Sequence, residues 1–91
     1  MINAANNRDN TFLMSINDLL TTIVKTIVNK PDIVRIEQES TVDNRHLFAI
    51  KVDEKDLGKV IGKNGQTIKS IRGLINAINT GLYDIAVDVS S

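Results

Sequence analysis

The sequence predicts an α+β fold in which a three-stranded sheet packs on three helices in the order αββααβ. Residues 12–28 carry apolar side chains at steps of three and four, which is the period of an amphipathic helix. Residues 33–39, 47–52 and 83–89 alternate apolar and polar side chains or are rich in β-branched residues, which favours strands. Between the second and third strands, two glycines three residues apart separate two further apolar helical patterns.

The first helix is expected to begin near Phe12 and to end before Pro31, because proline breaks the helical hydrogen-bond pattern. Its apolar stripe should face a protein core, since the opposite side is polar: Asn17, Asp18, Thr22 and Lys25. Residues 1–10 contain four asparagines and little apolar surface, so we expect a disordered, mobile tail there. The folded domain is expected to occupy residues 11–91.

The first two strands should pair as a hairpin across the polar residues 40–45. His46, the one histidine, is expected to be a partly exposed strand residue, because no cysteine or acidic pair stands near it at metal-ligand spacing. Asp53 is expected to cap a short helix that ends near Ile61. A longer helix should run from about Gln66 to Asn79, followed by Gly81 in a left-handed conformation.

Size and composition restrict the possible functions. Ninety-one residues with 42% apolar content are enough for one small domain. The absence of cysteine removes disulfides and thiolate chemistry and fits a reducing compartment. The sequence contains neither an apolar stretch of membrane-spanning length nor a signal-peptide pattern at its start, so we expect a cytoplasmic protein with no membrane partner.

The segment Gly62-Lys63-Asn64-Gly65 is the most informative motif. Two glycines without Cβ atoms let a tight turn bring its backbone close to a sugar-phosphate chain. The turn leads into a helix whose first N–H groups point toward the loop. Lys63 supplies a cation, and Asn64 tolerates unusual backbone angles and donates hydrogen bonds. The motif therefore predicts contact with nucleic-acid phosphate.

Other interpretations of these glycines were considered. A Walker phosphate loop fails, because counting from Gly58 places Lys63 where the second glycine should stand. A dinucleotide fingerprint fails, because Gly58 and Gly62 are four residues apart and follow a helical segment. An ordinary helix-to-helix corner capped by Gly62 remains possible, but it leaves the nearby basic residues unexplained.

Net charge is zero, but the charges are unevenly distributed. Residues 55–72 contain five basic residues against Asp56 alone, a local charge of +4. Residues 31–54 contain six acidic and three basic residues, a local charge of −3. A positive field around the glycine turn supports phosphate binding, although a charged segment can also be only a solvated face.

The order αββααβ with G-x-x-G between the second and third helices resembles the type II KH fold. The chain resembles the KhpA family of small bacterial single-KH RNA-binding proteins from about Phe12 to Val89, most clearly in residues 20–28, 56–65 and 68–72. Two features depart from the family pattern: the asparagine-rich start, and Gln66 where many members have an arginine after the second loop glycine.

The resemblance implies a groove between the glycine turn and one sheet edge that holds about four unpaired nucleotides. With three aromatic residues in the chain, base stacking should be minor. Ile61 is as well placed for the groove as for the core, whereas Ile68 should be core. The expected RNA-binding residues are Gly58, Lys59, Ile61, Gly62, Lys63, Asn64, Gly65, Lys69 and Arg72.

The resemblance also implies a role as an RNA chaperone or post-transcriptional regulator linked to cell elongation and division. It further implies homodimers, or heterodimers with a larger KH-containing RNA-binding protein (KhpB, also called Jag or EloR). The alternative is a KH-fold dimerisation module with weak or no RNA binding, in which the apolar edge of the long helix at Leu74 and Ala77 continues into a partner. No enzyme activity and no cofactor are expected, since the sequence shows no nucleophile with a base and no metal cluster.

Overall fold

The computed structural model of the chain describes residues 4–41, 43–81 and 83–91. The element order is the predicted αββααβ, with three short 3₁₀ turns between elements. The helices are α1 (Ala4–Ile27), α2 (Leu57–Ile61) and α3 (Gln66–Asn79). The strands are β1 (Arg35–Ser40), β2 (Arg45–Lys51) and β3 (Asp84–Ser90).

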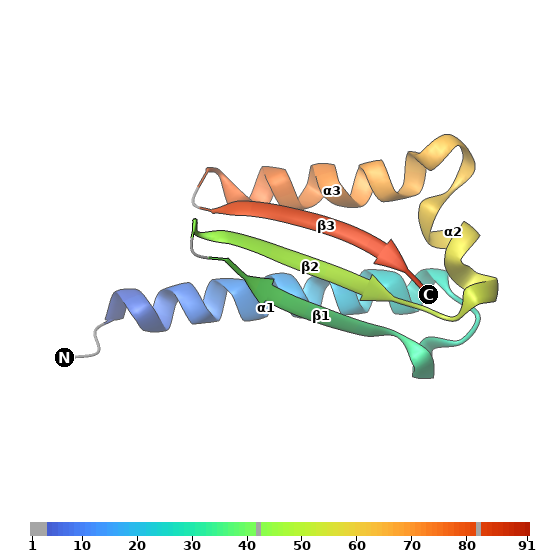
Figure 1. The fold of residues 1–91 in the computed structure, drawn as a ribbon, viewed down its shortest axis with the longest axis horizontal. Coiled ribbons are helices and arrows are strands. Elements are labelled where there is room, and N and C mark those ends of the chain that lie inside the picture. Colours follow the sequence, from blue (N-terminus) through green and yellow to red (C-terminus); the bar gives the residue numbers. More distant parts are fainter. Residues whose placement is uncertain (1–3, 42, 82) are drawn as a thin grey trace.

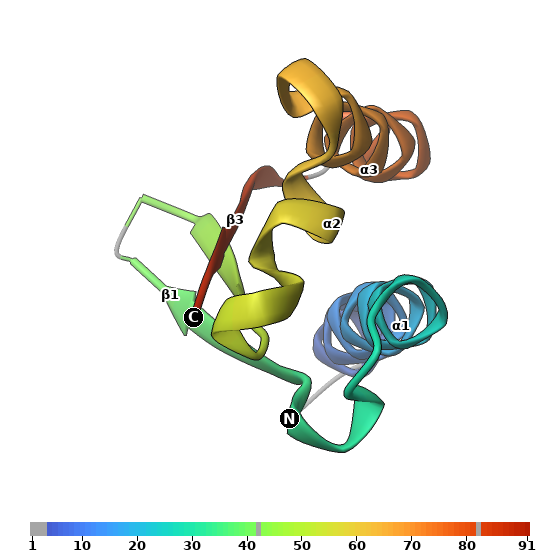
Figure 2. The ribbon, with the colours of Figure 1, turned by 90° about the vertical axis from the view of Figure 1, so that its right-hand side faces the viewer.

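The three strands form one mixed sheet in the order β1-β2-β3. β1 and β2 make the predicted antiparallel hairpin, with Ile36 opposite Ile50, and β2 pairs in parallel with β3, with Phe48 opposite Val87. All three helices lie on the same side of the sheet, and α2 lies at one end of it between α1 and α3 (Figures 1 and 2). The other face of the sheet is not covered by a helix, so the fold has two layers (Figure 2).

The core lies between the sheet and the helices. Alternate strand residues point inward, as the period of two requires, and they meet the apolar stripes of the helices. The apolar side chains that are almost completely buried are Ile16, Leu20, Val24, Phe48, Ile50, Val60 and Ile75. Ile68 is also buried, at 5% exposure, which confirms its assignment to the core.

Helix α1 begins at Ala4, so the predicted start near Phe12 is wrong. Extending a formed helix adds one hydrogen bond for each residue fixed, and this can carry it past the end of its apolar stripe. The predicted mobility of residues 1–10 stays a prediction, and residues 1–3 lie outside the described part of the chain. At the other end, Pro31 starts a 3₁₀ turn in which its carbonyl accepts from Val34 N at 3.2 Å, so β1 begins two residues later than predicted.

His46 is buried, at 7% exposure, and the prediction of a partly exposed residue is wrong. Because side chains alternate between the two faces of β2, His46 lies on the same face as the buried residues Phe48 and Ile50. Its ring lies edge-on to Tyr83, with centroids 5.0 Å apart, and Tyr83 stacks on Phe12. His46 Nδ1 is 3.0 Å from Ser40 Oγ, whereas Nε2 has no hydrogen-bond partner among the described residues. Burial in this aromatic cluster gives His46 a packing role.

The turn from α3 into β3 is held by a buried side chain, Asn79. Its amide nitrogen donates to Tyr83 O at 2.6 Å, and its amide oxygen accepts from Tyr83 N at 3.1 Å. Gly81 has the predicted positive φ of 81°, but the helix cap itself is Thr80, at φ 48° and ψ 35°. A β-branched residue is rare in that region, and the two Asn79 hydrogen bonds provide the local constraint that holds the turn.

A buried carboxylate connects α1 to α2. Asp56 is 1% exposed, and its two oxygens accept from the backbone N–H groups of Asn29 at 3.1 Å and Lys30 at 3.0 Å. Asp53 caps the preceding 3₁₀ turn as predicted, accepting from Lys55 N at 3.0 Å. The two aspartates therefore differ in strength of contact: Asp56 accepts two hydrogen bonds from distant backbone in the interior, whereas Asp53 caps its own turn and makes a partly exposed ion pair with Lys30 at 3.6 Å.

We expect Asp56→Ala to lower the free energy of unfolding by about 3 kcal/mol, because it removes two hydrogen bonds to a charged acceptor and leaves two N–H groups unpaired. Asp53→Ala is the control and should lower it by about 1 kcal/mol, because it removes a cap and a partly exposed ion pair that adds little. Urea unfolding of both variants measures the difference. Equal losses would contradict the connecting role of Asp56.

Candidate nucleic-acid interface

The glycine turn reverses the chain between α2 and α3 within four residues. α2 ends with Gly62 N donating to Gly58 O at 2.8 Å, and Gly65 N then donates to Gly62 O at 3.1 Å. Gly62 (φ 79°, ψ 170°), Asn64 (φ 57°, ψ 27°) and Gly65 (φ 73°, ψ 15°) all have positive φ. Three such residues in a four-residue segment need glycine or asparagine, which explains the composition of the motif.

The fold itself requires a glycine at position 62. A Cβ atom there would lie 2.6 Å from Thr67 Cβ and 2.7 Å from Thr67 N, closer than real atoms approach. Gly65 needs its glycine for the positive φ alone, because a Cβ there would meet no atom within 4 Å. Gly58 has open space at the Cβ position and no positive φ, so the fold does not require a glycine at this position.

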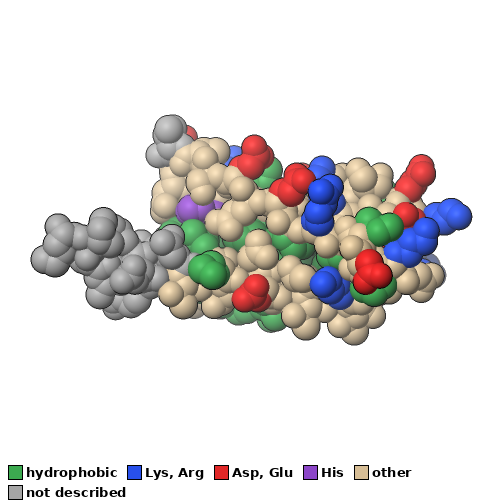
Figure 3. Space-filling model, turned by 90° about the horizontal axis from the view of Figure 1, so that it is seen from below, with side chains coloured by type: hydrophobic (Ala, Val, Ile, Leu, Met, Phe, Trp, Pro, Cys, Tyr) green, Lys and Arg blue, Asp and Glu red, His purple; other side chains and the backbone are tan. Residues whose placement is uncertain are grey.

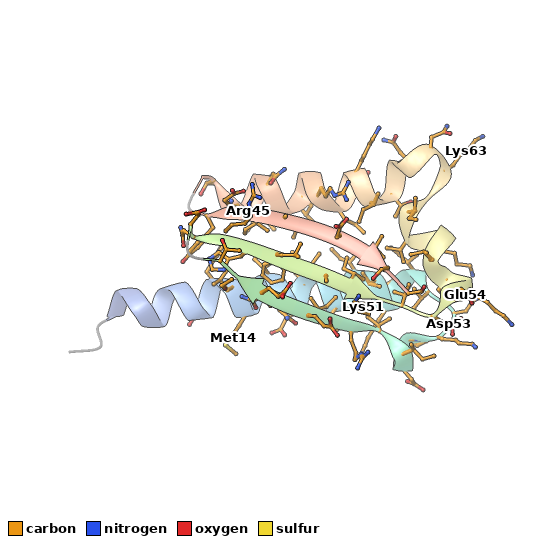
Figure 4. The ribbon with its side chains drawn as sticks, in the orientation of Figure 1. Met14, Arg45, Lys51, Asp53, Glu54 and Lys63 are labelled. Carbon is orange, nitrogen blue, oxygen red and sulfur yellow. The ribbon has the colours of Figure 1, made fainter. Side chains whose placement is uncertain are left out.

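Three lysines surround the turn without acidic partners. Lys59, Lys63 and Lys69 are exposed, and among the described residues none of them lies within ion-pair distance of a carboxylate. Lys63 projects from the tip of the turn, far from Arg45 at the opposite end of the sheet (Figure 4). Arg45 differs from these lysines because its Nε lies 3.0 Å from Asp84 Oδ2. The cations at the turn are therefore free to meet an anionic ligand.

The face on which α1 lies beside β1 has a different charge pattern. Acidic and basic side chains are interspersed there, and hydrophobic side chains show along the seam between the sheet and the helix (Figure 3). Asp56, the one acidic residue counted against the basic segment, lies in the interior and is bonded to backbone N–H groups. The exposed charge at the turn itself therefore comes from Lys59, Lys63 and Lys69.

A groove of about 350 Å³ lies between α3 and the outer edge of β3. Arg72, Ile75 and Asn76 line it from α3, and Ile85, Val87 and Asp88 line it from β3. The helix that bears these groove residues starts directly after the glycine turn, which lies at the N-terminal end of α3 (Figure 1). Arg72 is the groove residue nearest to the turn in sequence, so α3 connects the turn to the groove.

Arg72 lies in this groove and not at the turn. Its Nε donates to Val87 O at 2.9 Å, and its Nη2 lies 3.3 Å from Asp88 Oδ1. The side chain is still 44% exposed, so it borders the groove and can contact a ligand. Ile61, whose position the sequence left open, is 36% exposed at the end of α2, next to the turn.

The structure therefore brings Gly58, Lys59, Ile61, Lys63, Asn64 and the turn glycines together, and places Arg72 along the groove. Sequence reasoning missed Asn76, the β3 edge and Asp56. No local signal marks Asp56, because its hydrogen-bond partners are 26 and 27 residues away. Asn76 could have been found by its spacing from Lys69 and Arg72, since residues three and four apart share a helix face.

No helix in the described part of the chain is long and apolar enough to span a membrane. Residues 4–41, 43–81 and 83–91 contain no group of three His, Cys, Asp or Glu side chains positioned to hold a metal ion.

The family model of the KH domain of KhpA and KhpB matches residues 17–89. This chain belongs to the KhpA/KhpB family of KH domains. The predicted resemblance is thus confirmed, and the αββααβ architecture described above is that of a type II KH fold.

Several relatives carry the name RNA-binding protein KhpA. The Leifsonia xyli protein is 40% identical over 70 residues, covering 77% of this chain and 90% of its own length. The Thermotoga maritima protein is 36% identical, covering 79% of this chain and 95% of its own. The Clostridium acetobutylicum protein is 44% identical, covering 65% and 77%. No solved structure matches this KhpA/KhpB-type chain.

We expect Gly62→Ala to destabilise the domain by about 2 kcal/mol, because the new methyl group would clash with Thr67 at a backbone conformation reserved for glycine. Gly58→Ala is the matched control: it should be neutral or stabilising by up to about 1 kcal/mol, since alanine favours a helix and space is open. Chemical unfolding of both variants tests this. Wild-type stability in Gly62→Ala would show that the turn relaxes freely.

Proposed function

We propose that this chain binds short segments of single-stranded RNA, with the glycine turn holding the phosphate backbone and the α3–β3 groove holding the bases. The observation that carries the proposal is a turn of positive-φ residues, surrounded by three unpaired lysines, at the start of the helix that lines a groove. Its relatives are named RNA-binding proteins, which supports the same assignment.

The phosphate contacts would come from backbone and lysine together. Neither Gly62 nor Gly65 has a side chain to hold a ligand away, so a sugar-phosphate chain can approach the backbone closely. Lys59, Lys63 and Lys69 then neutralise phosphates on either side of the turn. If about three phosphates are contacted, the logarithm of the RNA association constant should fall with the logarithm of the salt concentration, with a slope of about −2.

The bases would be held without aromatic stacking. Phe48 is completely buried, and Phe12 and Tyr83 stack on each other near the start of β3, at the end of the sheet away from the turn (Figure 1). Apolar contact from Ile61 and Ile85 and hydrogen bonds along β3 would take the place of stacking. About four nucleotides is the span that such a groove holds.

At the level of the cell, we propose a cytoplasmic RNA chaperone or post-transcriptional regulator that is linked to cell elongation and division and is not an enzyme. The known family supports RNA as the partner. A neutral protein with a small basic patch binds weakly, and joining two copies would raise the effective concentration of sites.

A second function, pairing between KH domains, is favoured by two exposed apolar residues on α3. Leu74 is 43% exposed and Ile78 39% exposed, and they lie one helical turn apart on the side of α3 away from Arg72. We propose that this face joins a second copy of the chain or a larger KH-containing protein of the KhpB, Jag or EloR type. Burying it in a dimer leaves the α3–β3 groove open.

The double variant Lys63→Asp/Asn64→Asp should stay folded and lose RNA binding, because aspartate tolerates the left-handed region and two negative charges would face phosphate. Lys25→Asp/Thr26→Asp on exposed α1 positions makes the same change in net charge and is the control. Fluorescence anisotropy with an eight-nucleotide RNA gives the affinities. Equal binding by the wild type and the folded turn variant would refute the assignment of the turn.

We expect Leu74→Asp to shift a dimer to monomers, because it would bury a carboxylate without a partner. Met14→Asp, at a residue 65% exposed on α1, serves as the control and should not alter assembly. Sedimentation over a range of protein concentrations measures the mass. A wild-type chain that stays monomeric at every concentration would remove homodimerisation from the proposal.

A further inference from the structure

The outer edge of β3 turns its backbone hydrogen-bonding groups into the groove. Ser90 O accepts from Val52 N at 3.1 Å, so Ser90 faces the neighbouring β2, and by alternation Ile85, Val87 and Val89 face away from it. The bond from Arg72 to Val87 O, which comes from the α3 side, agrees with this phase. The groove therefore has a wall of N–H and C=O groups at alternate residues.

Arg72 alters the set of hydrogen-bonding groups that β3 presents to the groove at Val87. Its Nε donates to the Val87 carbonyl at 2.9 Å, which leaves that oxygen one further lone pair, and the Val87 N–H lies on the same outer edge of β3. The guanidinium carries five N–H donors and no acceptor. Asp88 Oδ1, 3.3 Å from Nη2, holds the group in place. At this level the groove presents neighbouring donors from Val87 and Arg72, and its acceptor is the exposed Asp88 carboxylate, whose Oδ1 is directed at the guanidinium.

We propose that Arg72 sets the base preference of the groove, selecting a nucleobase that presents two adjacent hydrogen-bond acceptors to Val87 N–H and the guanidinium. Cytosine offers O2 and N3, and guanine offers O6 and N7. Adenine places its N6 amino donor beside N1, and uracil places N3–H between its two carbonyls, so each would set a donor against a donor. This inference rests on the proposed function, that the groove holds single-stranded RNA.

Asn76 and the lysines at the turn do not provide the same discrimination. The Asn76 amide has both donors and an acceptor, so it can adapt to any base. The lysines at the turn would meet phosphates, which are identical for every sequence. Asp88 can also discriminate, because its carboxylate only accepts hydrogen bonds, but its Oδ1 lies 3.3 Å from Arg72 Nη2, so the two side chains act together.

The test uses four RNA octamers that differ only in two central nucleotides, CC, GG, AA or UU, between uridine flanks. The wild type should bind the CC or the GG octamer about tenfold more tightly than the AA and UU octamers, in line with a good bidentate base contact. Comparing the affinities for the CC and GG octamers shows whether cytosine or guanine is preferred. Arg72→Met should bring the four affinities within about twofold of one another. Arg72→Lys should also remove the preference, because lysine keeps the positive charge but lacks the planar pair of N–H donors of the guanidinium.

Lys63→Ala is the matched control: it should weaken all four octamers equally and keep the preference. Equal wild-type affinities for all four octamers, or a preference that survives in Arg72→Met, would overturn the inference while leaving RNA binding intact. Absence of binding to any octamer would overturn the proposed function and the inference with it. Should Arg72→Met fail to melt cooperatively, Asp88→Asn provides the second variant. Asp88→Asn removes the ion pair that fixes the Arg72 guanidinium. A base preference equal to that of the wild type in this variant would contradict the proposed role of Arg72.

Discussion

The bonds from the Asp56 carboxylate to the end of α1 fix the geometry on which the candidate interface depends. α2 has five residues, too few to hold its own orientation by helical hydrogen bonds alone. Its buried face offers one fully buried side chain, Val60. The carboxylate that precedes it therefore supplies much of the constraint, tying the helix to Asn29 and Lys30. Since the glycine turn follows directly, the position of the turn against α3 depends on this contact.

A protein of zero net charge can still attract an anion where its charges are arranged suitably. Asp56 is buried and bonded to backbone N–H groups, and Asp84 pairs with Arg45 at the end of the sheet away from the turn. The lysines of α2, the turn and α3 are left without such partners. Screening limits the range of their field to about 10 Å at moderate salt, so the attraction acts on a ligand already near the turn. This favours a local clamp over long-range steering.

The sequence predicted those features that local patterns encode. Helix and strand periods gave the element order and the hairpin, Asp53 was correctly expected to cap its turn, and the bounds of α3 were confirmed. The glycine spacing located the turn because positive φ is a property of single residues.

The features that the sequence did not predict depend on contacts between distant segments. Arg72 could not be assigned to the groove until β3 was placed beside α3, fifteen residues later. His46 was expected to be a partly exposed strand residue because no metal-ligand partner stands near it in sequence, and it is buried beside Tyr83, on which Phe12 stacks. Thr80 caps α3 in an unfavourable conformation because Asn79 holds the turn from within the fold.

The parallel pairing of β2 with β3 gives the two halves of the interface different folding requirements. The glycine turn is made from neighbouring residues and can form as soon as its flanking helices do. The groove wall requires the whole segment between Lys51 and Asp84 to fold back on the sheet, an ordering cost that is met before any β3 contact forms. An edge strand of this kind is where local opening is expected to be least costly. A molecule whose β3 has detached would keep the glycine turn and lose the groove. Such a molecule could still contact phosphates but could not recognise bases, so the two properties are separable in the native ensemble.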